Sequence, residues 1–284
     1  MLKKIFFAAA LLLASELIAK PVVIASIAPV EYLAKAVGGD KIEVQSLAKG
    51  DVHSYEPKPN DMKAVAKARI FIAAGLEFEE AWIPRFKASA KNLVVVQSDA
   101  KIAKLKEERG EQAEHDEKHE AHADPHVWLN PMLAITMARN ISDALIDMDK
   151  ANKDFYLKNF QKLMNDLLAF DESAKNELAG LKNRKFVVYH PAWGYFAAHY
   201  DLEQISIERS GKEPKIDEMA STLKMIKDEN IKVIFADPNR SQKSAQILAS
   251  QTGAKVELLD PLGYNLLENL KIAVGAIKDA NSPK

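Results

Sequence analysis

The sequence predicts an α/β protein of two similar halves, each with a four-stranded, mainly parallel sheet, joined by a long helix. In both halves of the 284-residue chain, short apolar runs rich in β-branched residues alternate with helical stretches. That alternation is typical of right-handed βαβ units and parallel sheets. The longest segment without glycine or proline, residues 132–179, lies between the halves. Since both residues interrupt helices, this segment predicts long, uninterrupted helical structure.

Eight strands are expected, four in each half, and most are continuous apolar runs, as buried parallel strands tend to be. They are Pro21–Ile27, Lys41–Leu47, Arg69–Ala74, Asn92–Gln97, Lys185–Tyr189, Leu202–Ile207, Lys232–Ala236 and Lys255–Leu259. Helices are expected between them at Pro29–Val37, Asn60–Lys67, Phe78–Ala90, Trp193–Tyr200, Ile216–Glu229, Gln242–Thr252 and Leu266–Ala280.

The central segment reads as an amphipathic helix, because apolar residues recur three or four apart from Leu157 to Leu178. Asp149 and Asn152 favour a break, with a second helix beginning near Ala151. At 1.5 Å per residue that helix would be on the order of 40 Å long, enough to connect two lobes. The alternative is two ordinary helices within one domain. The expected divisions are therefore a first lobe (20–150), a connecting helix (151–180) and a second lobe (181–284).

The first 19 residues have the layout of a secretory signal peptide. Lys3 and Lys4 precede an apolar run from Ile5 to Ala14, and small residues follow up to Ala19. The run is too short to span a bilayer, so we expect cleavage and export. The sequence contains no cysteine, which excludes disulfide bonds and a lipid anchor on cysteine. We therefore expect a periplasmic protein without a lipid anchor.

The charge and the motif content of the chain argue against two classes of function. The formal net charge is −1, and no basic stripe with interleaved aromatic residues occurs, which argues against a nucleic-acid partner. The sequence contains no Walker loop, Gly-x-Ser-x-Gly or Gly-x-Gly-x-x-Gly motif, so none of these motifs points to an enzyme.

Residues 104–124 form an unusual segment with four basic and eight acidic residues and few apolar ones, which predicts a mobile loop. It contains His115, His119 and His122, and His126 follows at once. On a continuous helix these four side chains would share one face and could hold a metal together. Pro125 argues against that continuity, because the residue before a proline avoids helical geometry.

Other metal-ligand candidates stand at strand ends. His190 follows the strand 185–189, Asp260 follows the strand 255–259, and a proline comes directly after each. His53 lies in a turn-rich segment after the strand 41–47. In open α/β sheets ligands bind beyond the carboxyl ends of strands, and three imidazoles with one carboxylate suit tetrahedral zinc. Taken singly, each has a simpler explanation as a turn residue, a core histidine or a helix N-cap.

Four segments carry a specific resemblance: GDVHSYEPKPND, DPHVWLNP, VVYHPAWGYFA and ELLDPLG. In this order they resemble the metal-ligand segments of the periplasmic zinc-binding proteins of ABC importers, the cluster A-I group, and the resemblance spans essentially the whole chain. It implies two (β/α)₄ lobes joined by a rigid backbone helix, with Zn²⁺ bound between them by His53, His126, His190 and Asp260. It also implies a monomer that delivers zinc to an inner-membrane ABC permease.

Manganese is the alternative cargo, but manganese-handling relatives usually carry glutamate in the place of His190, and imidazole suits zinc. Asp237 stands where relatives often show glutamate. Glu56, Asp124 and Asp237 are candidates to hold the imidazole tautomers by hydrogen bonds. The loop histidines His115, His119 and His122 would form at most a weak auxiliary zinc site, because the loop is shorter and poorer in histidine than in some zinc-binding relatives.

A secreted zinc hydrolase is the competing class of protein. Catalytic zinc keeps an open position for water, whereas three histidines and Asp260 would fill the coordination shell. The run His119-Glu120-Ala121-His122 lacks the helical metalloprotease pattern, whose second histidine would fall at Ala123.

Overall fold

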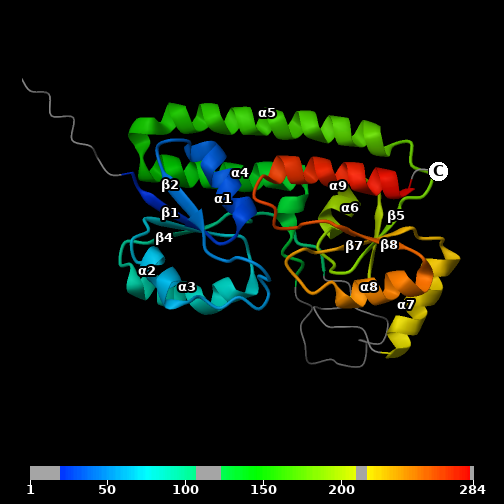
Figure 1. The fold of residues 1–284 in the computed structure, drawn as a ribbon. Coiled ribbons are helices and arrows are strands. Elements are labelled where there is room, and N and C mark those ends of the chain that lie inside the picture. The colour runs from blue at the N-terminus through cyan, green and yellow to red at the C-terminus, as the bar shows by residue number, and fades with distance from the viewer. Residues whose placement is uncertain (1–19, 107–122, 209–215, 282–284) are drawn as a thin grey trace, which may run out of the picture.

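The computed structural model describes residues 20–106, 123–208 and 216–281 and shows two four-stranded parallel sheets side by side (Figure 1). The first sheet has the order β2-β1-β3-β4 and the second the order β6-β5-β7-β8, so both lobes share one topology. All eight predicted strands are confirmed: β1 (Val22–Ala25), β2 (Glu43–Ser46), β3 (Ile70–Ala73), β4 (Val94–Gln97), β5 (Lys185–Val188), β6 (Glu203–Ser206), β7 (Val233–Ala236) and β8 (Lys255–Leu258).

The helices that cover the sheets also lie where the periodicity predicts them. They are α1 (Ala28–Gly38), α2 (Pro59–Val65), α3 (Glu77–Ser89), α6 (Gly194–His199), α7 (Ile216–Asp228), α8 (Lys243–Thr252) and α9 (Leu266–Asn281). None of the helices in the described ranges is long and apolar enough to cross a membrane.

The central segment forms two helices, α4 (Pro131–Met148) and α5 (Lys153–Leu178), separated by the short 3₁₀ turn η3 (Lys150–Asn152). Asp149 stabilises the break, because its Oδ2 accepts hydrogen bonds from Asn152 Nδ2 at 2.7 Å and from Tyr156 Oη at 3.0 Å. The interruption predicted at Asp149 and Asn152 is therefore confirmed.

The α5 helix runs along both lobes and packs on α1 and α4 of the first lobe and on α9 of the second (Figure 1). At 1.5 Å per residue it is about 40 Å long. The predicted connector is confirmed, while the boundaries assigned to the lobes, 20–150 and 181–284, stay a prediction.

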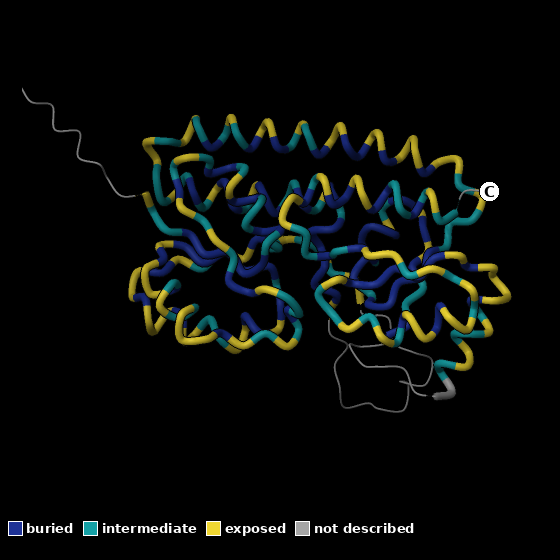
Figure 2. The backbone as a smooth tube through the Cα atoms, viewed as in Figure 1, coloured by how far each residue is buried: buried dark blue, intermediate teal, exposed yellow. Residues whose placement is uncertain are grey.

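The larger of two hydrophobic clusters in the described residues extends through both lobes. The inner face of α5 is buried and its outer face exposed (Figure 2). The core contains Phe71 of the first sheet, Trp128 between the lobes, and Phe196 of the second lobe. A smaller cluster, which includes Ile226 and Leu248, lies separately under α7 and α8. The lobes are thus joined by packing as well as by chain connections.

Candidate metal centre

Three histidines from distant parts of the chain converge between the lobes. His53 lies in the loop after β2, His190 follows β5, and His126 directly precedes the one-turn 3₁₀ helix η2 (Val127–Leu129). One nitrogen of each ring lies within 4.8 Å of the other two. The ring centroids are 5.0 to 5.4 Å apart. Within the described residues, this is the group of side chains whose ligand atoms are close enough to share one metal ion.

His126 is 4 % exposed and is held on two sides. Asp124 Oδ1 accepts hydrogen bonds from the backbone N–H of His126 at 2.9 Å and from its Nδ1 at 2.8 Å. The neighbouring Trp128 packs against the ring, and its indole Nε1 donates to the carbonyl of Pro261 in the second lobe at 2.8 Å. Because Nδ1 carries the proton given to Asp124, Nε2 is left as the atom that can ligate a metal.

His190, 6 % exposed, has the corresponding arrangement. Its Nδ1 lies 2.7 Å from Oε2 of the buried Glu208, and Arg240 Nη2 donates to Glu208 Oε1 at 2.9 Å. Arg240 Nη1 also lies 3.0 Å from the same Nδ1. An arginine only donates and a carboxylate only accepts, so both cannot bond Nδ1 at once. The shorter contact to Glu208 favours a protonated Nδ1, which again leaves Nε2 for a metal.

His53 differs from the other two. It is half-buried, and its loop is held by Asp51, whose Oδ1 accepts from the His53 N–H at 3.2 Å and lies 3.9 Å from Arg240 Nη1. The His53 ring Nε2 is buried, and no described residue forms a hydrogen bond with it. The Asp51 carboxylate thus bonds the backbone of His53 rather than its ring.

The environment favours the neutral form of the His53 and His190 imidazoles, which is the form that binds metal. Burial, and after it the neighbouring His126, lower the pKa of His53 from 6.5 to about 4. Burial likewise holds the pKa of His190 well below its usual value, followed by the effects of His126, Arg240 and His53. The buried Nε2 atoms of His53 and His190 have no hydrogen-bond partner among the described residues. A buried nitrogen without a hydrogen-bond partner is energetically costly. A metal cation could bind its lone pair, so these residues fit a bound cation.

The acidic candidates Asp260, Asp237 and Glu56 lie in different surroundings. Asp260 follows β8 in the second sheet but stands outside the group of three histidines, and its Oδ1 accepts from Asn239 Nδ2 and Leu262 N. Asp237 also accepts from Asn239, and burial raises the pKa of Asp237. Glu56 is exposed.

The loop candidates His115, His119 and His122 lie outside the described residues, so their role stays a prediction. The continuous helix that would join them to His126 is contradicted, because Ala123 pairs with Lys106 in a β-bridge and residues 124–126 are not helical.

Two residues of the site, Glu208 and Arg240, are not predicted from the sequence. Glu208 comes directly after the predicted strand 202–207, so the strand-end argument that found His190 also applied to it. Arg240 lies in the loop between β7 and α8, and no sequence pattern connects it with His190.

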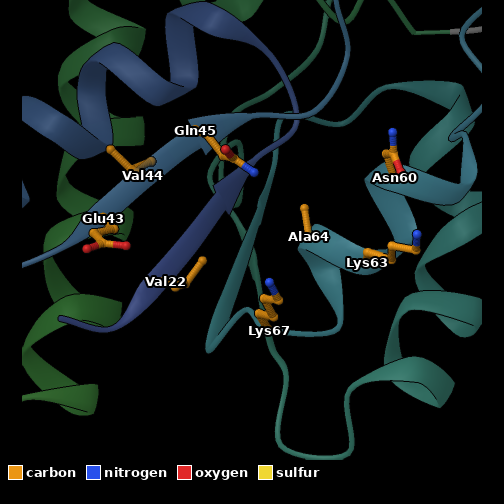
Figure 3. A pocket seen from close by; sticks show the side chains of 8 residues that line it. All are labelled: Val22, Glu43, Val44, Gln45, Asn60, Lys63, Ala64 and Lys67. Carbon is orange, nitrogen blue, oxygen red and sulfur yellow. The ribbon is translucent and has the colours of Figure 1, made fainter. Parts of the chain in front are cut away.

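A groove elsewhere in the first lobe has a different character. It has a volume of about 330 Å³ and lies between β2 and α2 (Figure 3). Its lining combines apolar side chains with Glu43, Lys63 and Lys67 and includes no histidine. It therefore does not offer the ligands of a transition-metal site.

The family comparison agrees with the geometry. The family of zinc-uptake complex component A, periplasmic (ZnuA), matches residues 23–280. The chain belongs to this family. The resemblance inferred from the four sequence segments is thereby confirmed.

Individual ZnuA proteins are similar over most of their length. The high-affinity zinc uptake system protein ZnuA of Bacillus subtilis (strain 168) is 30 % identical over 279 residues, which cover 91 % of this chain and 86 % of that protein. A crystal structure of ZnuA superposes with a TM-score of 0.85 at 35 % identity and covers 93 % of this chain and 100 % of that one. A ZnuA deletion mutant with zinc bound superposes with a TM-score of 0.86 at 34 % identity, covering 93 % and 99 %. The predicted two-lobe α/β fold is thus confirmed.

Proposed function

We propose that this protein captures Zn²⁺ between its two lobes outside the cytoplasmic membrane and delivers it to an ABC permease. The observation that carries the proposal is the convergence of three imidazoles whose nitrogens lie within 4.8 Å of one another. Membership of the ZnuA family supports zinc as the cargo and transport as the role. Neutral imidazole nitrogen is a preferred zinc ligand, whereas oxygen-rich sites suit manganese.

In this proposal, His53, His126 and His190 bind zinc through nitrogen and Asp260 supplies the fourth ligand. Asp260 follows β8 and adjoins Pro261, which lines a small cavity together with His190 and Asp237. A carboxylate from this loop would complete the tetrahedral shell preferred in closed zinc sites. With four protein ligands, zinc has no open position for a reacting water, which favours transport over hydrolysis.

Zinc competition titrations with a chromophoric chelator test the ligand set. We expect His53→Ala, His126→Ala and His190→Ala each to weaken zinc binding by at least 100-fold, and Asp260→Ala by a smaller factor. His199→Ala is the matched control, because His199 lies outside the group and bonds Asp171 at 2.6 Å. Wild-type affinity in all three ligand variants would refute the assignment.

The histidine loop calls for a separate experiment. A deletion of residues 111–122 removes all three loop histidines and keeps Lys106 and Ala123, which pair in an antiparallel bridge. We expect the shortened protein to keep one tight zinc site and to lose only weaker binding. Loss of the tight site would favour a site built from the loop histidines instead.

Transport requires a protein that receives the zinc and a defined cellular location. We propose a periplasmic location and an inner-membrane ABC permease as the recipient of zinc, as the family description supports. Zinc-limited growth of cells that lack this protein, restored by the wild-type chain but not by His190→Ala, would support delivery. Normal zinc-limited growth of the deletion strain would count against it.

A further inference from the structure

A buried tyrosine of the second lobe holds the chain segment that leads to His126. Tyr195, at the start of α6, is 3 % exposed. Its hydroxyl accepts a hydrogen bond from the backbone N–H of Leu105 at 2.8 Å and donates one to the carbonyl of Asp124 at 2.8 Å. Burial raises the pKa of this phenol to about 12, so it keeps its proton. Both hydrogen-bonding functions of the hydroxyl are therefore used.

The two residues whose backbone Tyr195 bonds, Leu105 and Asp124, are also hydrogen-bonded to each other. Lys106 pairs with Ala123 in an isolated antiparallel bridge, and the Asp124 N–H donates to the Leu105 carbonyl at 2.9 Å. Tyr195 thus adds a side chain of the second lobe to a contact between two chain segments. One hydroxyl fixes both segments relative to α6.

Asp124 transmits this position to the metal centre. Its Oδ1 is the acceptor for both the backbone N–H and the ring Nδ1 of His126. The carboxylate also lies directly against α6, because a Cβ added at Gly194 would be 3.1 Å from Asp124 Oδ2. The place of the Asp124 carboxylate is therefore set by α6, through Tyr195 on the backbone and through Gly194 at the side chain.

We propose that Tyr195 is a positioning residue for metal capture, which acts through Asp124 to set the tautomer and ring orientation of His126. The inference rests on the proposed function in one respect, that His126 is a zinc ligand. Partners of this kind orient the nitrogen that binds, and their loss typically weakens metal affinity about 10- to 100-fold. Since Tyr195 acts one contact further away, its effect should lie near the lower limit.

Tyr195→Phe tests the proposal, because it keeps the ring and removes both hydrogen bonds. In the metal-free protein, ¹⁵N NMR of the imidazoles should show a single Nδ1–H tautomer for His126 in the wild type and a mixture of tautomers in the variant. Zinc affinity should fall about tenfold. A combined variant with Asp124→Asn should bind zinc no more weakly than Asp124→Asn alone, because both changes interrupt one connection.

Tyr156→Phe is the matched control, since it removes one phenol hydrogen bond, to Asp149, from a fully buried tyrosine away from the histidines. It should leave zinc affinity and the His126 tautomer unchanged. An unchanged tautomer in Tyr195→Phe, or a combined variant in which the two losses add, would overturn the proposal. If His126→Ala binds zinc normally, the proposed function fails instead, and the tautomer of metal-free Tyr195→Phe still tests the link itself.

Discussion

At the scale of single residues, the site contains two kinds of histidine. His126 and His190 each have Nδ1 beside a buried carboxylate, Asp124 and Glu208, which fixes the tautomer before any metal arrives. The Nε2 of His53 is buried without a hydrogen-bond partner among the described residues, as is that of His190, but the carboxylate beside His53, that of Asp51, bonds its backbone N–H. Pre-set rings lose little freedom on binding. We therefore infer that His126 and His190 form the pre-organised part of the site and that His53 adapts to the metal.

Glu208→Gln should weaken zinc binding by about 10- to 100-fold, because a neutral amide orients the His190 imidazole less strongly and makes it a weaker donor. Competition titration at neutral pH measures the effect. Glu229→Gln is the control, since Glu229 is an exposed partner of Lys185 on the same lobe. Equal affinities of Glu208→Gln and the wild type would show that Glu208 has no part in tuning His190.

The lowered pKa of His53 predicts how the metal-free protein responds to acid. Its folded pKa of about 4 lies below the ordinary 6.5, so the unfolded chain takes up a proton first as the pH falls. The free energy of unfolding should therefore decrease between about pH 6.5 and 4. Chemical denaturation in the presence of chelator measures this slope. The slope should be shallower in His53→Ala, and equal slopes would contradict the assigned pKa.

At the scale of secondary-structure elements, the junction of α1 with α5 anchors the connector to the first lobe. The carbonyl of Val37 accepts from Asn159 Nδ2 of α5 at 3.0 Å. Gly39, which ends α1, has a φ of +56°, and a Cβ there would lie 2.8 Å from the ring of Phe155. Only glycine allows both this backbone conformation and the close approach of α5.

Gly39→Ala should destabilise the protein more than Gly253→Ala. Gly253 also has a positive φ, +77°, but a Cβ there would meet nothing within 4 Å. The Gly253 variant therefore reports the backbone cost alone, about 1–2 kcal/mol. The clash with Phe155, together with a ψ of −127° that lies outside the left-handed helical region, should add about 1–3 kcal/mol at Gly39. Urea unfolding measures the free energy of unfolding of both variants. Equal losses of stability would show that α5 moves aside in Gly39→Ala without an energetic cost. Zinc affinity should be unchanged in both variants.

At the scale of the whole molecule, the continuous core determines how the lobes behave. Buried residues of both sheets and of α4, α5 and α9 belong to one cluster. The separate cluster under α7 and α8 is smaller. Because the same side chains support both lobes, independent unfolding of one lobe would expose apolar surface of the other. Metal capture should accordingly proceed by loop and side-chain adjustment more than by wide separation of the lobes.

Calorimetry of the metal-free protein should show one unfolding transition rather than two. Zinc should raise the midpoint, because a ligand at 100 times its Kd stabilises the folded state by about 2.7 kcal/mol. Chelator should reverse the shift. Two resolved transitions in the metal-free protein would show that the shared core does not couple the lobes.

Local patterns were enough to predict the strands, the covering helices and the break between α4 and α5. Apolar runs, helical periodicity and the absence of glycine and proline each act over a few neighbouring residues. Strand ends followed by proline singled out His190 and Asp260 as candidate ligands, and sequence motifs added His53 and His126. These features depend on the local amino-acid sequence alone, so they could be predicted without the tertiary structure.

The tertiary structure was needed for contacts between residues far apart in the chain. Glu208 and Arg240 reach His190, and Tyr195 reaches Asp124, only because two sheets and α6 meet between the lobes. Likewise, the structure placed three histidines within reach of one ion and left Asp260 outside that group. The physical reason is that orientation, burial and tautomer depend on what surrounds a side chain in space, and local sequence does not specify those surroundings.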